Sequence, residues 1–128
     1  MPIDRTSTRN IERLHALTRH GDVALAGFYG EETLAWLRQC IARELPEAAP
    51  LEIGTPARMV AVLRELRRSK QAWSQVYGEI AADLAQDPAG FDAGRLHDFI
   101  AGCPWKFLRD SAADALQERE AGSDESAW

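Results

Sequence analysis

Several basic side chains fall within one short stretch of an otherwise acidic chain, between residues 64 and 70. Planar guanidinium groups bind phosphate or carboxylate oxygens in pairs, so this stretch could contact nucleic acid or an acidic protein. Two glutamines extend the same polar stripe of the expected helix. The candidate partner-binding or phosphate-binding face comprises Arg64, Arg67, Arg68, Lys70, Gln71 and Gln75.

Three interpretations of this basic face remain open. It could be a solvated helix surface, balanced by acidic residues such as Glu79, Asp83 or those of the 110–120 segment. It could also dock an acidic partner protein, or contact phosphates. Arg9 and Arg13 form a lesser basic patch on another predicted helix. The net charge of −5 does not favour a general nucleic-acid coat protein, so phosphate binding would rely on this local concentration of charge.

The string LRELRRSKQAWSQ resembles the opening of a repressor-type helix-turn-helix, in which a basic first helix precedes the recognition helix. The resemblance covers about a dozen residues and implies DNA reading by the following helix. That helix would be DAGRLHDFIAG, which sets Asp92 and Asp98 against Arg95. An acidic helix meets the phosphate field unfavourably and offers few donors to base edges, so the sequence departs from the pattern where recognition would occur.

Histidine and cysteine spacing does not indicate a metal site or a nucleophile. His15 and His20 are five residues apart and point to different sides of a helix, and His97 has only an aspartate beside it. Cys40 and Cys103 belong to no C-x-x-C pair, and buried free thiols are the favoured interpretation, with a disulfide left open. No phosphate-binding loop or protease signature is present. We therefore predict a protein that is not an enzyme and holds no metal or cofactor.

The basic face lies on the longest periodic segment, which is predicted to be helical over roughly 56–86. Thr55-Pro56 is a strong helix start, because a hydroxyl can cap and proline suits the first helical position. The apolar residues recur at heptad spacing with one interruption at Lys70. Their stripe is Met59, Leu63, Leu66, Trp73, Tyr77, Ile80 and Leu84, widened by Val60, Val62, Val76 and Ala81.

A broad apolar stripe of this kind is typical of a helix buried in a globular bundle. A straight helix over 56–86 would be about 46 Å long, longer than a compact domain of this size. Lys70 on the stripe therefore favours a break near residues 69–71 over an elongated molecule. The arginines are expected to face outward. The stripe fits packing within the chain or against a second copy, so a homodimer is an alternative.

Shorter helical patterns flank this segment. Helices are predicted over 8–20, 31–45, 92–101 and from 104 onward, with a short helical turn after Asp22 and a proline-rich loop over 46–56. No stretch alternates with the period of a strand. The fold expected is all-α, a single compact bundle of about five helices over residues 1–121, followed by a short acidic tail over 122–128.

The four tryptophans are expected in different surroundings. Trp73 and Trp105 lie on apolar helix faces and are expected in the core, whereas Trp36 lies off its helix's main stripe. Trp128 follows an acidic segment and is a candidate docking residue, because tryptophan is enriched at binding hot spots.

Taken together, these patterns predict a small cytoplasmic protein of bacterial or phage origin that does no chemistry of its own. It would act by binding another protein, as an adaptor, inhibitor, immunity-type protein or accessory subunit. The alternative is a nucleic-acid-binding accessory protein, or a helical subunit of a nucleoprotein complex, that uses Arg64, Arg67, Arg68 and Lys70. The N-terminus has no apolar leader, and no membrane role is expected.

Overall fold

The computed structural model describes the backbone of residues 5–126 and the side chains of residues 5–120, and within that range the chain is helical with no strand. This confirms the predicted all-α bundle. The short turn expected after Asp22 is a helix of its own, which brings the described helices to six. They are α1 (Arg5–Thr18), α2 (Asp22–Ala26), α3 (Glu31–Glu44), α4 (Pro56–Gln86), α5 (Gly94–Gly102) and α6 (Lys106–Ser126).

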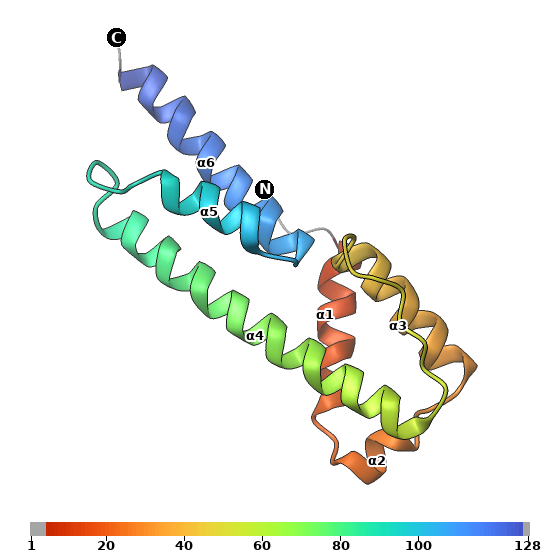
Figure 1. Ribbon diagram of the computed structural model, residues 1–128. Coiled ribbons are helices and arrows are strands. Elements are labelled where there is room, and N and C mark those ends of the chain that lie inside the picture. Colours follow the sequence, from red (N-terminus) through yellow and green to blue (C-terminus); the bar gives the residue numbers. More distant parts are fainter. Residues whose placement is uncertain (1–4, 127–128) are drawn as a thin grey trace.

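The long helix α4 is the axis on which the other helices are arranged (Figure 1). α1 and α2 pack on its first half (56–70), and α1 also contacts α3. α5 and α6 pack on each other and on the second half of α4 (71–86). A contact between α3 and α6 links the two ends, and one continuous hydrophobic cluster includes residues from all six helices.

The start of α4 is the one predicted from Thr55-Pro56. Thr55 has an extended backbone, and its hydroxyl oxygen accepts a hydrogen bond from the Arg58 amide at 3.1 Å. This bond satisfies one of the amide groups that a helix leaves unpaired at its first turn. Proline occupies the first helical position, where the missing amide proton costs nothing.

The predicted break near residues 69–71 is wrong, because α4 continues through this region without interruption. Trp105 packs against α4 at the position of the predicted break. Its ring is almost fully buried, and it donates its indole N–H to the Ser69 hydroxyl at 3.0 Å. Lys70 itself is half-buried beside it. The helix therefore continues past a polar residue on its apolar stripe, with Trp105 bonded to the residue before it.

The widening of the apolar stripe was predicted correctly only in the first half of α4. Val60 and Val62 are buried, but Val76 is 41% exposed and Ala81 is also exposed. In the second half α5 and α6 lie against α4, and their packing leaves these two side chains uncovered. A broad apolar pattern therefore does not mean equal burial along the helix.

The connection between α4 and α5 is held by two of its own aspartates and by one side chain of α6. The Asp87 carboxylate accepts the Gly90 amide at 3.0 Å, as in the predicted turn, and Asp92 accepts the Gly94 amide at 2.8 Å just before α5. From α6, Arg119 donates to the carbonyl oxygens of Pro88 and Phe91. The turn is thereby tied to α6, whose last residues overlap the predicted tail over 122–128.

Candidate functional site

Arg64 is the most heavily engaged residue of the predicted basic face. Its guanidinium donates to the carbonyl oxygens of Thr18 and His20, each at 2.6 Å, and to the Asp22 carboxylate at 2.8 Å. These carbonyls belong to the end of α1 and the turn that follows, where a helix leaves acceptors unpaired. Arg64 therefore closes the junction between α1 and α2, and the expectation that it faces outward is corrected.

Arg67 is used in the same way. It donates to the Thr18 hydroxyl at 2.7 Å, and that hydroxyl in turn donates to the Leu14 carbonyl at 2.7 Å. Thr18 is buried, so this bond lies partly inside the protein. Arg67 thus also points toward α1 and not outward, and two of the four basic residues are committed to holding the fold.

The remaining residues of the predicted face do not form one surface. Arg68 is 75% exposed and pairs with Glu65 on its own helix at 2.9 Å. Gln71 and Gln75 are exposed. Lys70 is half-buried, and its pKa lies below its ordinary value because of burial and then the nearby charge of Arg67. The structure therefore separates these residues into two fold-holding arginines, one half-buried lysine and an exposed polar strip.

His15 lies against this basic group. Burial lowers its pKa first, and the positive charges of Lys70, Arg67 and Arg19 lower it further. Its Nε2 atom is buried and has no hydrogen-bond partner among the described residues. Because the neutral ring is favoured, His15 belongs to the packing between α1 and α4 and is poorly placed to act as an acid.

The lesser basic patch also divides. The Arg13 guanidinium lies over the Trp36 ring, 4.8 Å from its centroid, whereas Arg9 is exposed. Trp36 donates its indole N–H to the buried Asn10 at 3.1 Å. Trp36, which lies off the α3 stripe in sequence, thus fastens α3 to α1. Trp128 lies outside the described residues.

Both cysteines are buried and unpaired, as the favoured interpretation predicted. Burial raises the pKa of Cys40 to about 12, with a further contribution from the Glu44 carboxylate. Burial also raises the pKa of Cys103. A thiol must ionise to act as a nucleophile, so neither is prepared for catalysis. Glu44 is fully buried; one of its oxygens accepts the Ser7 hydroxyl, and the other has no partner among the described residues.

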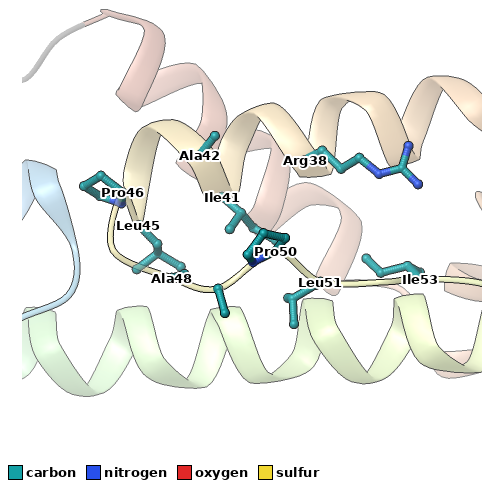
Figure 2. A pocket seen from close by; sticks show the side chains of 10 residues that line it. Arg38, Ile41, Ala42, Leu45, Pro46, Ala48, Pro50, Leu51 and Ile53 are labelled. Carbon is teal, nitrogen blue, oxygen red and sulfur yellow. The ribbon is translucent and has the colours of Figure 1, made fainter.

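Sequence reasoning missed a surface pocket between α3 and the proline-rich segment that follows it (Figure 2). It has a volume of about 400 Å³, and its lining is apolar except for one arginine. We call it the α3 pocket, and its lining residues are Arg38, Ile41, Ala42, Leu45, Pro46, Ala48, Ala49, Pro50, Leu51 and Ile53. The available signal was the alternation of Leu51, Glu52 and Ile53, a pattern typical of an extended segment that directs both apolar side chains to one side.

Other site classes have less support in the described part of the chain. Residues 5–120 contain no group of three or more histidine, cysteine or acidic residues placed to hold a metal ion. None of the described helices is both long enough and apolar enough to cross a bilayer. No protein-family model, curated protein or solved structure matches this chain.

Proposed function

We propose that this is a non-catalytic helical protein that acts by binding another protein, as an adaptor, inhibitor, immunity-type protein or accessory subunit. The α3 pocket is the observation that carries the proposal. It is open at the surface and apolar, and its volume of about 400 Å³ lies within the range of protein binding sites. Apolar lining that remains open to solvent on a folded domain is characteristic of an interaction site.

The state of the polar side chains supports the same proposal. Arg64 and Arg67 are engaged by α1, and the two thiols are buried with raised pKa values. These two arginines are therefore used by the fold and neither thiol is activated as a nucleophile, which supports binding over catalysis. Two buried unpaired thiols also favour a reducing compartment, and we propose a cytoplasmic protein of bacterial or phage origin.

Nucleic-acid binding through Arg64, Arg67, Arg68 and Lys70 has less support than protein binding. Of these four residues only Arg68 is largely exposed, and it already has an acidic neighbour. Binding to a labelled DNA or RNA duplex measured against salt concentration tests this alternative. A steep salt dependence that is flattened by Arg68→Gln would favour it over protein binding.

Quantitative affinity purification with chemical cross-linking tests the proposed function itself. The tagged protein is expected to retain a specific partner that is absent from a tag-only control. A matched pair of variants, Ala42→Gln in the α3 pocket and Ala35→Gln outside it, places the same new side chain at two exposed positions of α3. We expect only Ala42→Gln to lose the partner; the absence of any specific partner contradicts the proposed function.

A further inference from the structure

We propose that the α3 pocket binds an extended segment of a partner protein in which a large apolar side chain lies next to a carboxylate. This inference rests on the proposed function and names the chemistry of the partner. It follows from the shape of the pocket, the free backbone along its edge and the one charge on its rim.

The shape of the pocket fits an apolar side chain inserted from outside. Ile41, Leu45 and Ile53 are buried and form the floor, whereas Ala42 and Pro50 are exposed at the sides. Figure 2 shows the α3 residues on one side and the proline-rich segment on the other, with Ile41 and Pro50 pointing toward one another. A side chain entering here would meet an apolar surface on both sides.

The edge of the pocket offers unpaired backbone groups. Residues 49–54 have no regular secondary structure, and none of their amides or carbonyls forms a hydrogen bond with another described protein group. An extended peptide that lies beside such a segment gains main-chain hydrogen bonds, and its alternate side chains point the same way. A partner segment pairing with residues 51–53 would therefore direct every second side chain toward the pocket.

The positive charge at the rim of the α3 pocket favours a partner segment that carries an acidic residue next to its apolar side chain. Arg38 is the one charged residue of the lining; it is exposed and has no ion pair within the described residues. Glu52 lies between Leu51 and Ile53, but it is exposed and is not part of the lining. An uncompensated guanidinium beside an apolar cavity is complementary to a carboxylate that flanks an apolar side chain.

Selection from a displayed library of random octapeptides tests this inference directly. Peptides enriched on the wild-type protein are expected to share a large apolar residue with aspartate or glutamate one or two positions away. The affinity of the recovered peptide, made with a fluorescent label, is then measured by anisotropy. If no peptide is enriched, or if the shared charge is basic, the inference is overturned.

Two matched pairs of variants locate the peptide. Ala42→Gln should weaken binding at least about fivefold, because a polar side chain would occupy the apolar pocket, while Ala35→Gln should leave it unchanged. Arg38→Glu should weaken binding about tenfold, and Arg9→Glu, an equal charge change at another exposed position, should not. Replacing the peptide's acidic residue with lysine should restore binding to Arg38→Glu. Equal binding by both members of either pair overturns the inference.

Hydrogen exchange tests whether the bound peptide pairs with the backbone of residues 51–53. Peptide binding should slow hydrogen exchange at the amides of Leu51, Glu52 and Ile53, because they would enter new hydrogen bonds. Unchanged exchange at these three amides, with a peptide bound, overturns extended pairing.

Two further results separate this inference from the proposed function. A cross-linked partner that is retained equally by wild type and Ala42→Gln would leave protein binding standing and overturn the pocket as its site. Self-association in sedimentation velocity that is lost in Ala42→Gln would identify the occupant as a second copy, and would likewise overturn the assignment of a partner segment.

Discussion

The two halves of α4 carry one heptad pattern but are covered to very different extents. In the first half, Met59 and Leu63 are fully buried and the neighbouring stripe residues nearly so. In the second half, only Ile80 is buried, and Trp73 and Tyr77 are half-exposed. α1 and α2 cover the first half and are tied to it by Arg64 and Arg67, whereas α5 and α6 cover a narrower face of the second. Periodicity thus indicates which face of a helix is apolar, and the neighbouring helices decide how much of it is buried.

The largest difference between the halves should appear on truncating an apolar residue in each. Leu63→Ala should lower the free energy of unfolding by about 2 to 5 kcal/mol, because it empties a fully buried site. Val76→Ala should change it by about 0.5 kcal/mol or less, because Val76 is largely exposed. Urea unfolding followed by circular dichroism measures both. Similar losses at the two positions would show that the halves are equally packed.

Removing the hydrogen bonds that Arg64 makes to the end of α1 should have the next largest effect on stability. Arg64→Ala should lower the free energy of unfolding by about 1 to 3 kcal/mol, because two carbonyls at the end of α1 lose a charged donor. Asp22→Asn should cost about 1 kcal/mol or less, since this carboxylate is 77% exposed. Arg68→Ala, at an exposed ion pair, is the control and should be nearly neutral. A loss for Asp22→Asn as large as that for Arg64→Ala would assign the stabilisation to the ion pair instead.

The lysine at the midpoint of α4 should show a smaller effect of the opposite sign. Lys70→Met should raise the free energy of unfolding by roughly 0.5 to 1 kcal/mol, because an apolar side chain would replace a partly desolvated charge. The same substitution removes a positive neighbour of His15, so the pKa of His15 should rise toward 6.5 in an NMR titration. Destabilisation by Lys70→Met would mean that the ammonium group makes a favourable contact where α4 was expected to break.

The smallest effect should be a pH dependence carried by His15. Because its pKa is lowered in the folded protein, the unfolded chain binds the proton more tightly. The stability that depends on neutral His15 is therefore present above about pH 6.5 and is lost as the pH falls through the folded pKa. His15→Gln should make the free energy of unfolding less sensitive to pH between about 7.5 and 5. An unchanged slope would assign the dependence to other groups.

Much of the fold could be predicted because local chemistry favours it. Thr55 and Pro56 start α4 through a cap and a fixed φ angle, and both act within one helical turn. The apolar spacing then identified the buried face at Met59, Leu63 and Leu66. A break near Ser69 was predicted wrongly. The residue that hydrogen-bonds to Ser69 in the folded protein, Trp105, is 36 residues away in the sequence.

The candidate site was harder to predict than the fold. The basic face was recognised from Arg64, Arg67 and their neighbours, but their acceptors at the end of α1 are contributed by residues more than 40 positions earlier. The α3 pocket was missed because a helix and a loop form it jointly, and neither has a distinctive motif. Burial and partner identity are properties of the packed chain, which short-range patterns do not contain.

The sequence by itself determined that this chain is helical, where α4 begins and which of its faces is apolar, because capping, proline geometry and side-chain periodicity act over a few residues. Only the tertiary structure decided that α4 is continuous, that Arg64 and Arg67 face α1, and that an apolar pocket with a single arginine opens beside α3. These outcomes depend on which distant groups compete for each side chain, and that competition is settled only when the helices pack.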